Sequence, residues 1–261
     1  VRPGDTVIYT PSPSAGYRLS SVSAKTNTGA SVSMTANANG TYSFVVPSGA
    51  TSVTVTPSFV KTTTTTLPFT DVPTTAWYYN GVEYCYNTVR GSARLMQGMS
   101  ATTFGPNTGF TRAQVVQILW NIKGCPEPKT TYNPYTDISS IHYAYKAMLW
   151  ATQNGYAEGY VDKGVRTFRP NQNVTRQEMA VFLWRAAGKP TNYNSLNLNA
   201  YTDGYMVYDW AQPAMRWAIA RGVLSGQSSV ALGNYLSPRT VAYRSEVAVT
   251  VMNFDKLAVF R

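Results

Sequence analysis

Charged side chains are scarce in this sequence: they make up 13% of the 261 residues, and only 12 residues are acidic. Histidine occurs once and cysteine twice, without a CxxC pair, which excludes a zinc site built from these ligands. No apolar run approaches the roughly 18 residues of a membrane span, so no membrane insertion is expected. We predict no cofactor and no metal.

Basic residues are in excess, with 22 Lys and Arg and a formal charge of +10, but they are spread along the chain. No Lys/Arg run of the kind that binds nucleic acid occurs, so we predict no nucleic-acid partner. A diffuse positive field favours an anionic polymer instead. The polar surface, with 19 Tyr, suits an extracellular protein, and Val1 begins within a pattern, as expected for a fragment of a longer exported chain.

The two cysteines, Cys85 and Cys125, lie 40 residues apart. One interpretation is a disulfide formed outside the cell. The other is two free, buried thiols, which we favour because Cys85 occupies the position of Ala151 and Ala218 in the repeats described below.

Residues 1–60 read as β-strands, because β-branched segments such as DTVIYT, TYSFVV and TSVTVTP alternate with Pro, Gly or Asn. Asn39-Gly40 is typical of a hairpin turn. The segment resembles the divergent B-repeat modules of bacterial surface proteins, which implies a small all-β spacer. Residues 61–68, KTTTTTLP, predict an extended linker.

One sixteen-residue pattern occurs three times: PNTGFTRAQVVQILWN from Pro106, PNQNVTRQEMAVFLWR from Pro170 and PRTVAYRSEVAVTVMN from Pro238. After each arginine, residues at i, i+3, i+4 and i+7 mark one helix face. The positions are Val115, Ile118, Leu119 and Ile122; Met179, Phe182, Leu183 and Ala186; and Val247, Thr250, Val251 and Phe254. Three helices of one build are therefore predicted.

Two of these helices begin with a capping box, at Thr111 with Gln114 and at Thr175 with Glu178. An arginine follows at the first helical position, where a cation opposes the helix dipole by about 0.3–1 kcal/mol. The arginines are Arg112, Arg176 and Arg244. Their recurrence leaves three interpretations: a surface arginine, an arginine paired with a nearby carboxylate, or a site for a carboxylate or phosphate.

Each helix closes a longer unit, and the units span residues 69–128, 129–190 and 191–261. The opening aspartates are 66 residues apart: Asp71, Asp137 and Asp203. An aromatic residue at the first helix follows (Trp77, Tyr143, Trp210), then a glycine (Gly98, Gly159, Gly226), then an aromatic ahead of the proline (Phe104, Phe168, Tyr235). Each unit is too small to bury a core alone, so the three must pack together.

This order of motifs resembles the S-layer homology (SLH) repeat over residues 69–256. The resemblance implies a multidomain fold, in which the small all-β module precedes a mainly α-helical, pseudo-threefold trimer of repeats. It also implies grooves between repeats that bind secondary cell-wall polymer, through pyruvylated N-acetylmannosamine. The chain would then be a non-enzymatic, monomeric anchoring module on the bacterial cell wall or S-layer, with an anionic polysaccharide as its partner.

The same resemblance implies roles for the repeated residues. Arg112, Arg176 and Arg244 would bind the carboxylate; Asp71, Asp137 and Asp203 would accept hydrogen bonds from sugar hydroxyls; Trp77, Tyr143 and Trp210 would stack on sugar rings; Gly98, Gly159 and Gly226 would permit close approach. Structural interpretations remain open: the aspartate caps a turn, the aromatic is core, and the glycine supplies a positive φ.

The repeats differ from the family pattern in places. Gln114 stands where the pattern has Glu, the first repeat has a longer loop with Arg90 and Arg94 that either extends or obstructs its groove, and Tyr243 replaces the capping Thr. Because the second repeat is the complete one, we expect Arg176 to contribute more to binding than Arg244. Two other functions remain: a structural S-layer or adhesin component with its activity upstream, and a wall-active glycosidase.

Overall fold

The computed structural model describes residues 1–12, 17–37, 41–61, 67–193, 195–229 and 233–260. The chain divides into two compact units, Val1–Thr66 and Leu67–Arg261, which are described separately here. Within the described residues, no helix has the length and apolar character to cross a bilayer.

The part of the first unit that the structure describes forms two three-stranded antiparallel sheets. One contains β1 (Thr6–Tyr9), β5 (Tyr42–Val45) and β4 (Thr35–Ala36), and the other contains β3 (Ser31–Val32), β2 (Tyr17–Thr26) and β6 (Val53–Lys61). Ala24, Phe44 and Val46 form its buried apolar centre. The predicted β character is confirmed, and the predicted Asn39-Gly40 turn lies outside the described residues.

In its described residues, the second unit carries two α-helices in each repeat. They are α1 (Tyr79–Asn87) and α2 (Arg112–Ile122), α3 (Tyr145–Gln153) and α4 (Arg176–Ala186), and α5 (Gln212–Ala220) and α6 (Arg244–Lys256). Single turns of 3₁₀-helix lie at Leu198–Ala200, Gly204–Met206 and Asp209–Ala211. The predicted starts of α2, α4 and α6 are confirmed, and all twelve positions of the predicted helix faces are buried.

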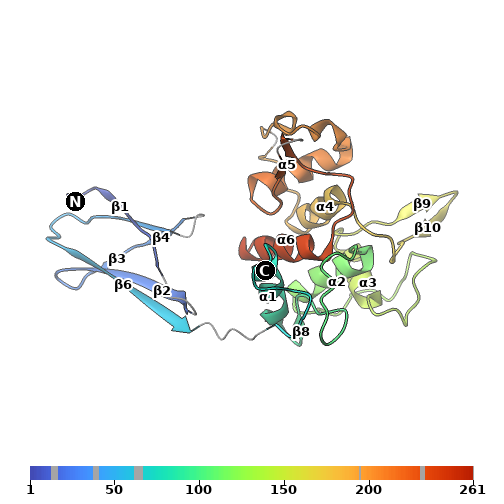
Figure 1. Cartoon of the computed structure of the whole chain (residues 1–261), viewed down its shortest axis with the longest axis horizontal. Coiled ribbons are helices and arrows are strands. Elements are labelled where there is room, and N and C mark those ends of the chain that lie inside the picture. The colour runs from blue at the N-terminus through green and yellow to red at the C-terminus, as the bar shows by residue number, and fades with distance from the viewer. Residues whose placement is uncertain (13–16, 38–40, 62–66, 194, 230–232, 261) are drawn as a thin grey trace. The chain divides into compact units, whose positions relative to one another are not determined.

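Helices pair across the repeats. The second helix of one repeat packs on the first helix of the next, α2 on α3 and α4 on α5, while α6 packs back on α1 (Figure 1). The last repeat therefore contacts the first, although their helices are far apart in sequence.

Backbone hydrogen bonds link the three repeats in a closed ring just ahead of the capped helices. Phe110 N–H donates to Ala242 O at 2.9 Å, Ala242 N–H donates to Val174 O at 2.9 Å, and Val174 N–H donates to Phe110 O at 2.8 Å. The side chains of all three residues are buried. Each repeat thus both donates and accepts at the centre of the unit.

A short antiparallel hairpin in each repeat was not predicted: β7 (Val89–Arg90) with β8 (Ala93–Arg94), β9 (Tyr160–Asp162) with β10 (Val165–Thr167), and β11 (Gln227–Ser229) with β12 (Gly233–Tyr235). In the second and third repeats the hairpin follows Gly159 or Gly226. In the first repeat it precedes Gly98, so the longer loop there forms the hairpin itself.

Candidate functional site

Each repeat-opening aspartate holds the loop that leads to the capped helix. Asp137 Oδ1 and Oδ2 accept from the backbone N–H groups of Phe168 and Arg169, both at 2.7 Å. The matching pairs accept from Phe104 and Gly105 at Asp71, and from Leu236 and Ser237 at Asp203. The third equivalent of Phe104 and Phe168 is therefore Leu236, and the prediction of Tyr235 at this position was wrong. Both carboxylate oxygens are already used within the loop.

The repeated glycines are required by close packing rather than by backbone φ, because Gly98, Gly159 and Gly226 do not have the positive φ that one interpretation proposed. A Cβ at Gly159 would lie 2.2 Å from Tyr135 Cε1 and 2.4 Å from Thr167 O. Gly98 and Gly226 are approached in the same way by the rings of Phe69 and Tyr201.

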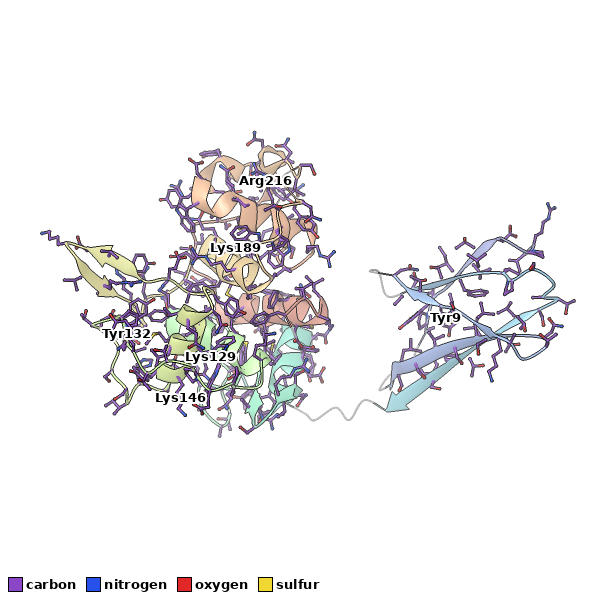
Figure 2. The ribbon with its side chains drawn as sticks, turned by 180° about the vertical axis from the view of Figure 1, so that it is seen from behind. Tyr9, Lys129, Tyr132, Lys146, Lys189 and Arg216 are labelled. Carbon is purple, nitrogen blue, oxygen red and sulfur yellow. The ribbon has the colours of Figure 1, made fainter. Side chains whose placement is uncertain are left out.

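The three helix-start arginines are buried, with 4–6% of their surface exposed. Each arginine donates two hydrogen bonds to backbone carbonyls of the next repeat in the ring. Its Nε donates to the residue two positions before the proline of that repeat. Its Nη2 donates to the residue directly before the glycine of that repeat. The acceptors are Phe168 and Glu158 for Arg112, Leu236 and Ser225 for Arg176, and Phe104 and Gln97 for Arg244, at 2.6–2.8 Å. The interpretation as exposed surface arginines is wrong. Lys129, Lys146 and Lys189, in contrast, are exposed on this unit (Figure 2).

Burial lowers the pKa of Arg112 and Arg244 from the ordinary arginine value. For Arg112, the hydroxyl of Tyr160 and the carboxylate of Glu178 act in the opposite direction, and for Arg244, Asp71 and Tyr143 do so. An arginine keeps its charge under all ordinary conditions, so these are buried cations. Their remaining N–H groups need acceptors.

The first-helix aromatics are largely exposed, at 67% for Trp77, 61% for Tyr143 and 54% for Trp210. The interpretation of these side chains as core residues is therefore wrong. Tyr143 stacks on His142 with ring centres 4.7 Å apart, and Trp210 stacks on Tyr208 at 5.9 Å. Supported, exposed rings of this kind offer faces to a ligand.

Three pockets bring the predicted residues together, with cavities of about 280, 380 and 390 Å³. In each one the arginine comes from one repeat, the glycine from the next repeat in the ring and the aromatic from the third. We name the pockets by their arginines. The sets are Arg112, Gly159 and Trp210; Arg176, Gly226 and Trp77; and Arg244, Gly98 and Tyr143. Nine of the twelve predicted site residues thus line pockets, and the three aspartates lie behind the loops, outside the described linings.

Sequence reasoning missed one whole wall of each pocket. The wall is one face of the capped helix. It consists of the third residue of the helix and the residues three, four and seven positions after it. Its members are Gln114, Gln117, Ile118 and Asn121; Glu178, Val181, Phe182 and Arg185; and Glu246, Val249, Thr250 and Asn253. The signal that could have found it was the helical spacing from the capping Gln or Glu.

The longer loop of the first repeat lines the Arg244 pocket through Ala93, Leu95, Met96 and Gln97, whereas Arg90 and Arg94 are not among its described lining residues. Arg90 Nη2 pairs with Asp255 Oδ2 at 2.9 Å. Arg94 donates to the Tyr86 carbonyl and lies over the Tyr86 ring, 4.1 Å from its centre.

Both predicted capping boxes are present, at Thr111 with Gln114 and at Thr175 with Glu178. As predicted, Tyr243 makes no side-chain hydrogen bond to cap its helix among the described residues. One half of the box persists, because Tyr243 N–H donates to Glu246 Oε2 at 3.1 Å.

Cys85 and Cys125 are both free in the described part of the chain. Cys85 is fully buried, as are Ala151 and Ala218, whereas Cys125 is only half-buried. The expectation of free thiols is confirmed, but the expectation that both are buried was wrong. The described residues also contain no cluster of His, Cys, Asp and Glu that could hold a metal ion.

Comparison with known protein families gives matches to the S-layer homology domain at residues 68–116, 134–180 and 200–230. Among similar proteins, exoglucanase XynX of Acetivibrio thermocellus is 26% identical over 166 residues, 62% of this chain and 14% of that protein. The surface-layer 125 kDa protein of Lysinibacillus sphaericus is 28% identical over 62% of this chain and 13% of its own. The cellulosome-anchoring protein of Acetivibrio thermocellus is 26% identical over 51% of this chain and 30% of its own.

The chain therefore carries three S-layer homology repeats. The matched region covers less than a third of the length of each of these three relatives. Residues 1–60 lie outside the matched segments, and their resemblance to B-repeat modules stays a prediction.

Proposed function

We propose that the helical unit attaches its protein non-covalently to the bacterial cell wall by binding an anionic secondary cell-wall polymer in the three pockets. The observation that carries the proposal is the composition of each pocket: a buried guanidinium, a close-packed loop at a glycine and an exposed aromatic. A cation in a partly apolar cavity binds a carboxylate, and an exposed ring packs on the apolar face of a sugar.

The cyclic exchange of residues supports a second part of the proposal, that the three repeats are related by a pseudo-threefold axis. Arginine, glycine and aromatic are contributed by successive repeats in each pocket. The central backbone hydrogen bonds close the same ring in the reverse sense, each N–H donating to the preceding repeat. Three similar pockets suit a polymer, because a repeating ligand can occupy several sites of one chain at once and so gain avidity.

The location of this protein follows from its relatives. The similar proteins include a surface-layer protein and a cellulosome-anchoring protein, whose names place them at the cell surface. We therefore assign this chain to the exterior of the bacterial cell. The pyruvylated N-acetylmannosamine ligand is the specific part of the proposal, with pyruvate ketal as the source of the carboxylate.

An enzymatic role for the pockets has less support. The Arg112 pocket contains two carboxylates, Glu158 and Glu178. Glu158 is paired with Arg185 at 2.9 Å, and Glu178 Oε2 accepts from both the N–H and the hydroxyl of Thr175. Carboxylates held this way are poorly placed to exchange protons with a glycosidic oxygen. We propose a binding module, with any catalytic or lattice-forming activity in the remainder of a longer protein.

Sedimentation with purified cell wall tests the proposal. We expect the chain to sediment with intact wall and to remain soluble when the secondary polymer has been stripped. The triple variant Trp77→Ala, Tyr143→Ala and Trp210→Ala should lose most of this binding.

The matched control replaces two exposed tyrosines outside the three pockets, Tyr132→Ala and Tyr205→Ala, which are 74% and 79% exposed. Equal binding to stripped wall, or an equal loss in the triple variant and the control, would contradict the proposal.

A further inference from the structure

A further cavity of the helical unit lies within the second repeat and shares no lining residue with the three pockets. It encloses about 250 Å³, and its lining is almost entirely apolar. Leu149 of α3 and Pro134 form part of its wall, together with Tyr132 and Thr152. Leu149 is buried, whereas the Tyr132 side chain is 74% exposed, so the cavity opens to solvent beside an aromatic ring.

The cavity is present because a large side chain is missing from one helix position. The eighth residue of the first helix is Tyr86 in the first repeat, Thr152 in the second and Ile219 in the third. The Tyr86 ring packs edge-on against Phe69 with ring centres 5.0 Å apart, and Ile219 packs against the core. Thr152 is smaller than either, and its hydroxyl shares a hydrogen bond with the Tyr135 hydroxyl at 3.2 Å. The second repeat therefore lacks the bulky group that the other two repeats supply themselves.

The first repeat shows which group suits such a space. There the guanidinium of Arg94, from the hairpin of that repeat, lies over the Tyr86 ring, 4.1 Å from its centre. The hairpin of the second repeat also supplies an arginine, Arg166, which lines the cavity and lies 5.7 Å from the centre of the Tyr135 ring. A guanidinium favours the face of an aromatic ring, so a second ring entering the cavity would find both apolar walls and a cation.

The surroundings of the cavity are basic. Lys129 and Arg166 are exposed, and neither forms an ion pair with a residue that the structure describes. The backbone N–H of Lys129 donates to the lining residue Gln153, which places this lysine at the cavity. Lys146, on the same face in Figure 2, is paired with Glu127 at 2.8 Å. None of the described lining residues carries a carboxylate, so acidic groups on a partner would be attracted here.

The lining favours an aromatic side chain over a sugar. A sugar site needs several donors and acceptors that are free to bind its hydroxyls. Thr152 Oγ1 and Gln153 Oε1 are both already hydrogen-bonded within the chain. An aromatic ring buries apolar surface without needing these atoms.

We propose that this cavity is a docking site for a partner polypeptide, which inserts an aromatic side chain flanked by Asp or Glu. The ring packs between Leu149, Pro134 and Tyr132, and the flanking carboxylates face Lys129 and Arg166. Because the cavity is separate from the three pockets, the partner and the wall polymer can be bound at the same time. The proposal does not depend on wall binding.

The experiment is a titration of the whole isotope-labelled chain with acetyl-Glu-Tyr-Glu-amide, followed by amide NMR. We expect the largest shifts at residues 130–133 and 149–153. Acetyl-Glu-Ala-Glu-amide, which lacks the ring, should shift none of these amides. Acetyl-Lys-Tyr-Lys-amide should bind about threefold more weakly or worse, because its charges are repelled.

Three variants test the residues of the cavity. Thr152→Ile supplies the residue of the third repeat and should abolish binding by filling the space. It should fold, because Ile219 already combines with an opening tyrosine, Tyr201, in the native chain, and circular dichroism checks this. Tyr132→Ala should weaken the peptide about threefold to tenfold, as expected for one lost aromatic contact. Arg166→Glu should abolish binding of the acidic peptide, whereas the matched control Arg221→Glu, at an exposed arginine of the third repeat, should leave it unchanged.

Equal shifts with the peptide that lacks the ring, or full binding by folded Thr152→Ile, would overturn the proposal. Should Thr152→Ile unfold, equal binding by Arg166→Glu and Arg221→Glu would overturn it instead. Shifts at this cavity with methyl N-acetylmannosaminide but not with the tyrosine peptide would identify a sugar site and likewise reject a polypeptide partner. Thr152→Ile should sediment with intact wall as the native chain does, so a loss of wall binding by the native chain would contradict only the proposed function.

Discussion

Arg90 Nη2 and Asp255 Oδ2 lie 2.9 Å apart, in an ion pair that joins the first repeat to the end of the last helix. The Asp255 side chain is fully buried, whereas that of Arg90 is 31% exposed. Tyr84 of α1 donates its hydroxyl to the same carboxylate at 2.6 Å. The packing of α6 on α1 joins the last repeat to the first. The buried carboxylate of Asp255 lies at this contact.

Arg90→Ala should therefore destabilise the helical unit, because it leaves a buried carboxylate without its cation. We expect a loss of about 3 kcal/mol, near the lower end of the range for breaking a buried pair. Urea unfolding followed by far-ultraviolet circular dichroism measures it. The control is Lys146→Ala, which removes the exposed pair with Glu127 and should cost less than about 1 kcal/mol. Equal effects would show that the α6–α1 contact does not depend on this pair.

Asp137→Ala should lower stability by roughly 3 kcal/mol, since two backbone N–H groups lose a charged acceptor. Asp137→Asn should recover only part of this, because an amide presents a single acceptor oxygen. Asp162→Ala, at an exposed position in β9, is the control and should change the urea midpoint little. If Asp137→Ala instead kept full stability but lost wall binding, a direct contact between Asp137 and sugar would be favoured.

Gly105→Ala should destabilise more than Gly124→Ala, although both glycines have a similar positive φ of +73° and +75°. Left-handed backbone costs an alanine about 1–2 kcal/mol at either position. At Gly105 the new Cβ would also lie 2.2 Å from Met99 Sδ, whereas nothing lies within 4 Å at Gly124. The difference between their thermal unfolding midpoints isolates the cost of the contact. Identical midpoints would mean that Met99 moves away freely.

The two thiols should differ in reactivity. Burial, and secondarily the charge of Asp255, raises the pKa of Cys85, and burial raises the pKa of Cys125 as well. A raised pKa reduces the thiolate that reacts with alkylating agents at pH 8. We expect slow labelling of half-buried Cys125 and labelling of Cys85 only after unfolding, as followed by mass spectrometry. A native Cys85–Cys125 bridge would contradict this.

Local periodicity predicted the helices well. The spacing of Val115, Ile118 and Leu119 marks a face that is buried in the structure, and the Thr111 capping box fixes the first residue of the helix. The hairpins escaped prediction because β9 and β10 contain three residues each, which is too short for an alternating pattern to be recognised.

The candidate site residues were named one by one from the sequence, but how the repeats combine them was not predicted. Arg244 donates to the carbonyl of Gln97, which lies 147 residues earlier in the chain. Grooves between repeats were expected, but no local pattern encodes a contact between the last repeat and the first, so the set of residues that each groove combines was not predicted. The capping interpretation of Asp137 anticipated a structural role but not its partners, Phe168 and Arg169, which lie 31 and 32 residues away.

The cyclic sharing of pocket residues also governs how this protein can be shortened. The chain does not contain one site per repeat, because each cavity takes its arginine, glycine and aromatic from three different repeats. A gene truncated after residue 190 would still encode two repeats yet no complete pocket. Wall attachment should therefore be lost in a single step rather than in thirds. Duplication of one ancestral repeat would have gained a full pocket only once a third copy closed the ring.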